Sequence, residues 1–398
     1  MNPASSVNPA SRAAPRVGIR CDAGPLIGVG HLVRCVALAE ELVSRGAAVT
    51  FLGDLGGLAW ASDQLTGRRL PLLAAGTSPG GLAAQALALG LDAVVLDSYT
   101  IPPATGETLR AAGLRVAAVI DGDPRGQVAD LYVDQNLGAE ERDVPLPEGA
   151  VRLAGARYVL LRDAVRRLRA VPAGSGERPG GERGAARAGE TGGVVEGVAG
   201  ETGGAVEGVA RETEGTAEGV AGETGKVPVT GPPRVLCFFG GTDAAGMAHR
   251  WADTLAAVGV PFSATLVSPR PLPARPGITV VPPTDGLPEL MASADLVITA
   301  AGTSCWELLY LGVPAALVWV ADNQLTGYEA LVGRELAAGL GPGCSAAGAV
   351  PLLRELLTRP ALRARYAERG RGLVDGRGRE RVAGALLDGL RRRGAGPR

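Results

Sequence analysis

The first part of the chain alternates between short apolar runs and stretches in which apolar residues recur every three to four positions. The apolar runs at 16–21 and 48–52 predict buried strands, and the periodic stretch from His31 to about Ser44 between them predicts a helix. Two further runs, 93–97 and 116–121, each end in an aspartate. Strands that alternate with helices predict a doubly wound parallel sheet.

The second part repeats this plan. The residues predict strands at 234–239, 262–267, 295–299 and 315–320 and helices that begin near 305 and 378. The sequence therefore predicts an α/β protein with two Rossmann-like domains, at 16–170 and 234–376, followed by a C-terminal helix and tail at 377–398.

The segment between these domains, 171–233, has no aromatic residue and contains an 11-residue repeat that begins at 189, 200 and 211, with a partial copy at 222. Each glycine in a helix costs about 1 kcal/mol relative to alanine, so the repeat is not expected to form a helical supercoil. We predict a disordered, low-complexity insert here, and a disordered N-terminus at 1–15.

Composition narrows the classes of function. Lys and Arg total 40 against 41 Asp and Glu, so the chain has no net positive charge. A nucleic-acid partner is therefore not indicated. The five cysteines form no CxxC pair, which disfavours a zinc site or a disulfide framework. The polar N-terminus lacks the apolar core of a signal peptide, and no apolar run reaches 18 residues. We therefore expect a cytoplasmic protein without a membrane span.

The loops that carry candidate chemistry follow predicted strands, and ligands of open α/β sheets bind at the carboxyl ends of strands. In the first loop, Gly28 and Gly30 allow close backbone approach to a ligand, and His31 begins the next helix. The positive end of the helix dipole disfavours imidazolium, so His31 is expected to be neutral and able to act as a general base. A packing or capping role is the alternative.

Two loops of the second domain are candidates for nucleotide binding. The first is suited to phosphate or sugar contact and equally to a plain turn; it comprises Gly240, Gly241 and Thr242. The second places small and hydroxyl residues at a helix start, where they can bind a diphosphate; these are Gly302, Thr303 and Ser304. Glu307 could bind both hydroxyls of a ribose, or could be a solvent-facing helix residue.

The order of these motifs resembles a known family. The motifs are GxGH (28–31), DSY (97–99), GARYVLLR (155–162), GGTD (240–243), AGTSCWE (301–307), LGVP (311–314) and DNQ (322–324). They resemble those of the UDP-2,4-diacetamido-2,4,6-trideoxy-β-L-altropyranose hydrolase of pseudaminic acid biosynthesis and of spore-coat polysaccharide biosynthesis proteins. Both are related to the glycosyltransferase that completes lipid II, which has the GT-B fold: two Rossmann-like domains that face each other across a cleft.

The resemblance implies specific roles. The hydrolase releases UDP by attack of water at the anomeric carbon, without a metal or other cofactor, and its GxGH histidine corresponds to His31. The helix-start loop and the glutamate that hold the UDP correspond to Gly302, Thr303, Ser304 and Glu307. We also predict that Gly240, Gly241 and Thr242 bind UDP. The sugar-binding set is placed at the strand ends and at the DNQ motif; it comprises Asp22, Gly28, Gly30, Tyr99, Asn323 and Gln324.

The sequence thus predicts a hydrolase that acts on a UDP-linked diacetamido-trideoxy or related hexose in surface or spore polysaccharide biosynthesis, alongside enzymes of the same pathway. A GT-B glycosyltransferase is the main alternative, with His31 deprotonating an alcohol acceptor instead of water. An apolar or basic patch on the first domain would favour a lipid or polymer acceptor. A non-catalytic nucleotide-sugar binding protein is the second alternative. A NAD enzyme is disfavoured because the first loop lacks a full GxGxxG.

Overall fold

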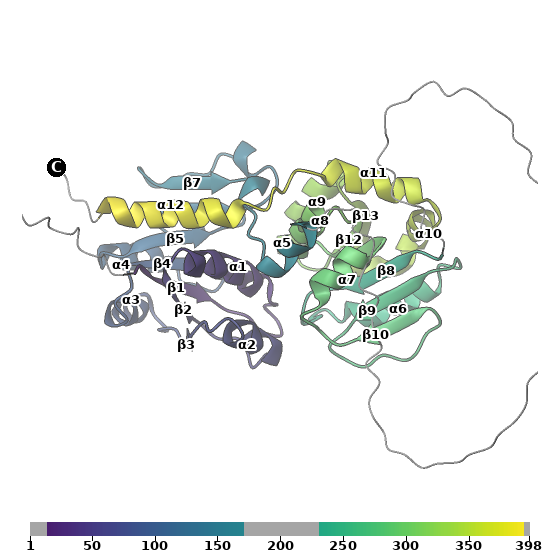
Figure 1. The fold of residues 1–398 in the computed structure, drawn as a ribbon, viewed down its shortest axis with the longest axis horizontal. Helices are drawn as coiled ribbons and strands as arrows, with labels where there is room; N and C mark the ends of the chain where they lie inside the picture. The colour runs from purple at the N-terminus through teal and green to yellow at the C-terminus, as the bar shows by residue number, and fades with distance from the viewer. Residues whose placement is uncertain (1–13, 171–230, 394–398) are drawn as a thin grey trace, which may run out of the picture. The chain divides into compact units, whose positions relative to one another are not determined.

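The first half of the chain forms a seven-stranded sheet in the order β3-β2-β1-β4-β5-β6-β7, with all neighbouring strands parallel (Figure 1). In this computed structural model, residues 14–170 and 231–393 are described. The predicted disordered segments, 1–15 and 171–233, lie almost entirely outside the described residues. The elements are β1 (Arg16–Cys21), α1 (Gly30–Ser44), β2 (Ala48–Leu52), α2 (Ala59–Thr66), β3 (Leu72–Leu73), α3 (Pro79–Ala88), β4 (Ala93–Asp97), α4 (Thr105–Ala111), β5 (Arg115–Val119), β6 (Leu131–Asp134), η1 (Ala139–Glu141), β7 (Val151–Ala154), η2 (Ala156–Tyr158) and α5 (Asp163–Ala170).

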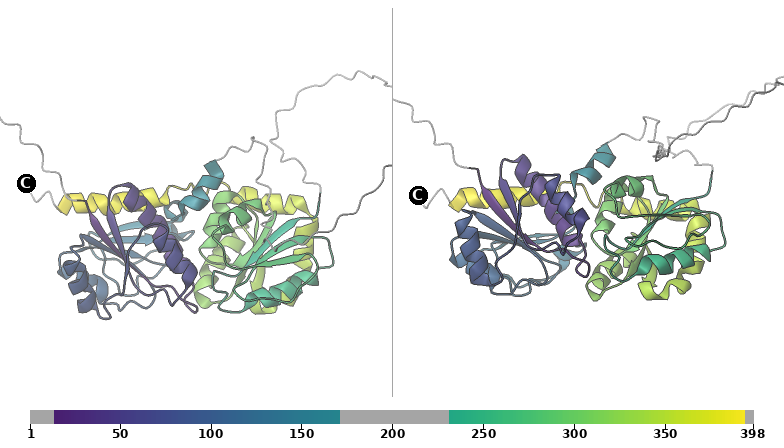
Figure 2. Two further views of the ribbon diagram at one scale, coloured as in Figure 1. Left: turned by 60° about the horizontal axis from the view of Figure 1, so that its bottom comes forward. Right: turned by 90° about the horizontal axis from the view of Figure 1, so that it is seen from below.

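The second half forms a six-stranded parallel sheet in the order β10-β9-β8-β11-β12-β13. Helices lie on both faces of each sheet (Figure 2). The elements are β8 (Arg234–Phe238), α6 (Met247–Ala256), β9 (Ser263–Val267), β10 (Ile278–Val281), α7 (Leu287–Ser293), β11 (Leu296–Ala300), α8 (Ser304–Leu311), β12 (Ala315–Trp319), η3 (Asp322–Gln324), α9 (Leu325–Gly333), β13 (Ala338–Pro342), η4 (Gly343–Ala349), α10 (Val350–Thr358), α11 (Pro360–Gly370) and α12 (Gly378–Arg393).

The central strands are apolar on both faces because helices cover both sides of a parallel sheet. In β4, Val95 packs in the core that includes α1, whereas Val94 and Leu96 pack in the core that includes α3 and α4. We call the assembly around the seven-stranded sheet the first lobe, and that around the six-stranded sheet the second lobe. The predicted pair of doubly wound parallel sheets is confirmed.

Each lobe contains a helix from the other half of the sequence. Val165 of α5 packs in the core of the second lobe with Leu308. Val382 and Leu386 of α12 pack in the core of the first lobe, where α12 lies beside α1 (Figure 1). The predicted domain boundaries at 170 and 377 follow the order of the sequence. The packing instead places α5, which ends the first half of the chain, in the second lobe, and α12, which ends the second half, in the first lobe.

Both sheets reverse their strand order at one point, between β1 and β4 in the first lobe and between β8 and β11 in the second. At such a switch point the loops leave adjacent strands toward opposite faces, which opens a crevice at the carboxyl edge. The first, second and third candidate loops follow β1, β8 and β11. Within the described residues, no helix is long and apolar enough to cross a lipid bilayer.

Candidate active site

A cleft of about 650 Å³ contains nearly all of the predicted site residues. This volume is within the usual range for small-molecule sites. Its walls come from the loops at the switch points of both lobes. The predicted residues that line it are Gly28, Gly30, His31, Tyr99, Gly240, Gly241, Thr242, Gly302, Thr303, Ser304, Glu307, Asn323 and Gln324.

His31 lies in the first turn of α1 and contacts a buried carboxylate. Its Nδ1 is 2.6 Å from Oδ1 of Asp97, the last residue of β4, and Asp97 is fully buried. An ionised carboxylate can only accept, so Nδ1 carries the proton of this hydrogen bond, and in the neutral ring Nε2 then keeps the lone pair. Asp97 therefore fixes the ring orientation and the tautomer that a general base requires.

Asp97 is held by further donors. Arg34, one helical turn after His31, donates from Nε to Oδ2 at 2.7 Å and from Nη2 to Oδ1 at 2.6 Å. The thiol of Cys35 also donates to Oδ2, at 3.2 Å. Burial by itself would raise the pKa of Asp97, but the charge of Arg34 and the hydrogen bonds from Arg34 and His31 outweigh it and lower the pKa to about 2. Asp97 is therefore ionised at neutral pH.

Tyr99 links the imidazole to a second carboxylate. Its ring packs edge-on against His31, with 4.6 Å between ring centroids, and its hydroxyl donates to Oδ2 of Asp121 at 2.6 Å. Burial and the charge of Asp121 raise the pKa of Tyr99 to about 12, so the hydroxyl stays protonated. Burial opposes ionisation of Asp121, but Arg34 outweighs it and lowers the pKa of Asp121 well below its usual range.

Some glycines of the cleft are required by the backbone conformation, and others by the space around them. Gly28 and Gly240 adopt left-handed φ values of 82° and 78°, which disfavour other residues. A Cβ at Gly30 would lie 3.0 Å from Oγ1 of Thr303. Gly30 therefore leaves room for a side chain of the second lobe, in addition to any ligand contact. A Cβ at Gly302 would meet no atom within 4 Å, so this backbone borders open space.

Glu307 is buried and paired, which differs from the solvent-facing alternative. It lies in the first turn of α8 and is 3% exposed. Its Oε1 accepts from Nε and Nη2 of Arg162, at 3.2 and 2.9 Å. Both bonds use Oε1, and Glu307 is also among the residues that line the cleft.

Two residues of the DNQ motif, Asn323 and Gln324, line the cleft, and Gln324 also forms a local hydrogen bond. Oε1 of Gln324 accepts from the backbone N–H of Val320 at 3.0 Å, which orients the loop after β12. The side chain of Asn323 lies near the Tyr99 hydroxyl, where it opposes the rise in the pKa of Tyr99. Asn323 therefore approaches the His31 side of the cleft from the second lobe.

Two aspartates of the motifs are structural. Asp22 does not line the cleft; its Oδ2 accepts from the hydroxyls of Ser98 and Thr100, at 3.1 and 3.3 Å, and so holds the loop after β4. Asp243 caps α6 by accepting from the N–H groups of Met247 and Ala248. We predicted Asp22 to contact the sugar; its bonds instead place it behind Tyr99.

Sequence reasoning did not assign roles to four residues that complete the site. Arg34 lies three positions after His31, so both are on one face of α1. Asp97 and Asp121 were recognised as strand-terminal aspartates, and this was the signal that could have placed them together. Arg162 closes the GARYVLLR motif, but only the three-dimensional path of the chain brings it to Glu307.

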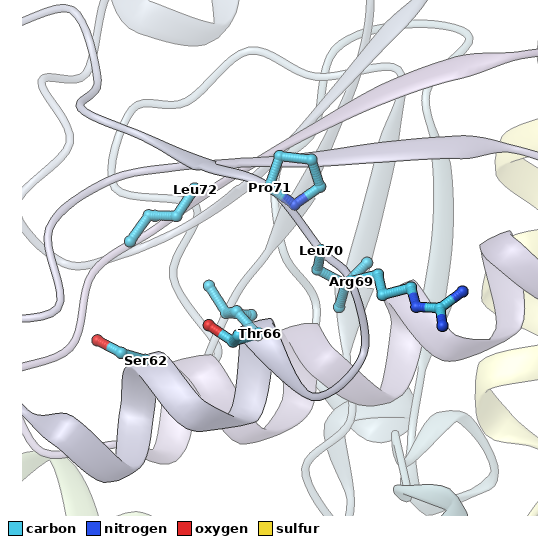
Figure 3. Close-up of a pocket in the computed structure, with 7 residues that line it drawn as sticks. Ser62, Thr66, Arg69, Leu70, Pro71 and Leu72 are labelled. Carbon is cyan, nitrogen blue, oxygen red and sulfur yellow. The ribbon is translucent and has the colours of Figure 1, made fainter.

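The described residues outside this cleft were searched for a metal site and for a second pocket. Among the described residues, no group of three or more His, Cys, Asp or Glu is arranged to hold a metal ion. A second pocket, of about 460 Å³, lies between α2 and β3 (Figure 3). Its lining is Ser62, Leu65, Thr66, Arg69, Leu70, Pro71 and Leu72, and the guanidinium of Arg69 extends away from Ser62 and Leu72.

The sequence and the fold were compared with those of known proteins. Residues 270–330 match the family model described as the glycosyltransferase family 28 C-terminal domain. No curated protein matches the sequence. Among solved structures, Acinetobacter baumannii MurG is similar with a TM-score of 0.59 and 15% identity, over 94% of this chain and 99% of its own.

Two further structures show the same fold. Spinosyn forosaminyltransferase SpnP has a TM-score of 0.60 and 15% identity, over 94% of this chain and 99% of its own. A Listeria monocytogenes protein described as a UDP-N-acetylglucosamine 2-epimerase has a TM-score of 0.54 and 14% identity, over 96% and 98%. The protein has the GT-B fold and resembles glycosyltransferases. The predicted membership in the hydrolase family stays a prediction.

Proposed function

We propose that this protein is a glycosyltransferase that moves a sugar from a nucleotide-sugar donor to the hydroxyl of an acceptor. The observation that carries the proposal is the contact between His31 Nδ1 and Asp97 Oδ1, in a cleft that also contains the Gly302–Ser304 turn. A base oriented by a carboxylate at one wall and a phosphate-binding turn at the other are the two groups that glycosyl transfer needs.

In the proposed reaction, Nε2 of His31 takes the proton of the acceptor hydroxyl. The acceptor oxygen attacks the anomeric carbon, and the bond from this carbon to the diphosphate oxygen breaks. The diphosphate leaves with the electron pair of that bond, and the positive end of the α8 dipole stabilises its charge. Asp97 balances the positive charge that the imidazole gains.

Two observations favour transfer over hydrolysis. The first is the match to the glycosyltransferase family 28 model, and the second is a pair of exposed apolar residues on the first lobe. Leu26 is 91% exposed and Ile27 is 47% exposed, and both line the cleft beside His31. Exposed apolar side chains beside a cleft are typical of a surface that binds another molecule, and water as the nucleophile would not require such a surface. The hydrolysis predicted from the sequence differs only in its nucleophile, and a UDP donor, the diacetamido-trideoxy hexose and the pathway stay predictions.

The test is an assay of nucleotide release. The full chain is incubated with a panel of UDP- and CMP-sugars, with and without a mixture of sugar and lipid alcohols, and phosphorus NMR follows the free nucleotide. Release that requires an acceptor supports transfer. Equal release without an acceptor shows a hydrolase. No release in either arm, with donor binding intact, shows a binding protein and contradicts the proposal.

Glu307→Gln is expected to weaken binding of UDP about 10-fold, measured by calorimetry on the full chain. A hydrogen bond to a charged group contributes roughly 1.5–3 kcal/mol, and the amide keeps the shape but not the charge. Glu329→Gln is the control, because Glu329 is exposed on α9 and does not line the cleft. Unchanged UDP affinity in Glu307→Gln would remove Glu307 from the nucleotide site.

A further inference from the structure

Two arginines of the first lobe line the cleft without a carboxylate at hydrogen-bond distance. Four arginines line it: Arg34, Arg125, Arg142 and Arg162. Arg34 and Arg162 are paired with the buried carboxylates described above. The nearest carboxylate oxygen to Arg142 is Oδ2 of Asp134, at 3.7 Å. Within the described residues, the guanidinium of Arg125 forms no ion pair. The first lobe therefore presents to the cleft one guanidinium that forms no ion pair among the described residues, that of Arg125, and one whose ion pair is long, that of Arg142.

Both guanidinium groups border one loop, between β5 and β6. Arg125 belongs to this loop and has a left-handed φ of 50°, with its backbone N–H bonded to Oδ1 of Asp123 at 2.7 Å. Arg142 lies against the same loop, because its Nη1 would be 2.8 Å from a Cβ at Gly122. The two positive charges therefore gather at one part of the wall.

This part of the wall is close to the proposed base. The guanidinium carbon of Arg125 lies 4.4 Å from the centroid of the Tyr99 ring, and the imidazole of His31 packs on the same ring at 4.6 Å. The two contacts together place the guanidinium within about 9 Å of the imidazole. That separation suits one sugar ring that offers a hydroxyl to His31 and a charged substituent to Arg125.

We propose that Arg125 and Arg142 bind an anionic group of the acceptor, so that the acceptor is an alcohol that carries a carboxylate or a phosphate. Guanidinium groups bind both anions through paired, charge-assisted hydrogen bonds. The donor diphosphate has its own expected site at the start of α8, in the other lobe. This inference rests on the proposed transfer function and names the chemistry of its second substrate.

The test measures binding of matched probes to the full chain saturated with UDP. The probes are methyl β-glucuronide, glucose 6-phosphate and the neutral methyl β-glucoside, followed by ligand-observed NMR. We expect at least one anionic probe to bind about 10-fold more tightly than the neutral probe, which corresponds to about 1.4 kcal/mol. The double variant Arg125→Gln/Arg142→Gln is expected to lose this preference and to keep its affinity for UDP.

The control removes the same charge elsewhere. Arg377 and Arg391 have side chains that are 69% and 73% exposed, so Arg377→Gln/Arg391→Gln is expected to bind all probes as the wild type does. Equal binding of charged and neutral probes overturns the inference, as does anion affinity that survives the double variant. A parallel loss of UDP affinity would instead assign the arginines to the donor diphosphate. These outcomes are independent of the nucleotide-release assay, which tests the transfer function itself.

Discussion

Replacing His31 by alanine is expected to lower kcat by about 10²- to 10⁴-fold, the usual contribution of a general base. The variant loses the acceptor of the hydroxyl proton but keeps the nucleotide turn in the other lobe. The affinity for UDP is therefore expected to change little. Steady-state kinetics with the donor and acceptor found in the nucleotide-release assay, together with calorimetry for UDP, measure both effects.

Two further variants sharpen this test. Asp97→Asn keeps the size of the side chain but removes the charge that orients and balances the imidazole, so kcat should fall while the affinity for UDP is retained. His249→Ala is the matched control, because His249 lies on α6 with a side chain that is 59% exposed. Wild-type turnover by His31→Ala would refute the proposed role of the imidazole.

Arg34→Met is expected to destabilise the fold by about 3–5 kcal/mol at pH 7, because removal of one partner leaves buried charge uncompensated. Arg34 is 4% exposed and is the cation shared by Asp97 and Asp121. Methionine fills a similar volume but cannot pair with either carboxylate. Urea unfolding measures the free-energy difference. Arg45→Met is the control at the C-terminal end of the same helix, because the ion pair of Arg45 with Glu41 is more exposed and worth about 1 kcal/mol or less.

The same variant has a defined pH dependence. The pKa of Asp97 in the fold is about 2, below its ordinary value of 3.8. The stability that this pairing contributes is therefore complete above about pH 4 and is lost as the pH falls toward 2. The difference between wild type and Arg34→Met should shrink as the pH falls from 7 to 3. A difference that stays constant over this range would show that packing, not charge, accounts for the loss.

Sequence patterns predicted the central strands well and the edge strands poorly. The strands around each switch point are apolar on both faces, so their runs stand out. The edge strand β3 is only Leu72–Leu73, and β13 reads AGLGP, a sequence with two glycines and a proline. Such strands lack an apolar run because only one neighbour and part of one face cover them.

The site was predictable where one loop carries its own motif. His31 and the Gly302–Ser304 turn follow strands in the sequence, and both line the cleft. The carboxylate of Asp97 and the guanidinium of Arg162 act across long sequence separations, 66 residues to His31 and 145 to Glu307. Hydrophobic periodicity indicates which face of an element is buried, but not which polar groups meet there.

The mutual placement of α5 and α12 limits how this protein can be divided or recombined. A cut within 171–230 would leave α5 on the N-terminal fragment, although α5 packs in the core of the second lobe. It would leave α12 on the C-terminal fragment, although α12 packs in the core of the first lobe. Neither contiguous half is therefore an autonomous folding unit. Chimeras that exchange lobes between two proteins of this fold would need to take α12 from the parent of the first lobe and α5 from the parent of the second lobe.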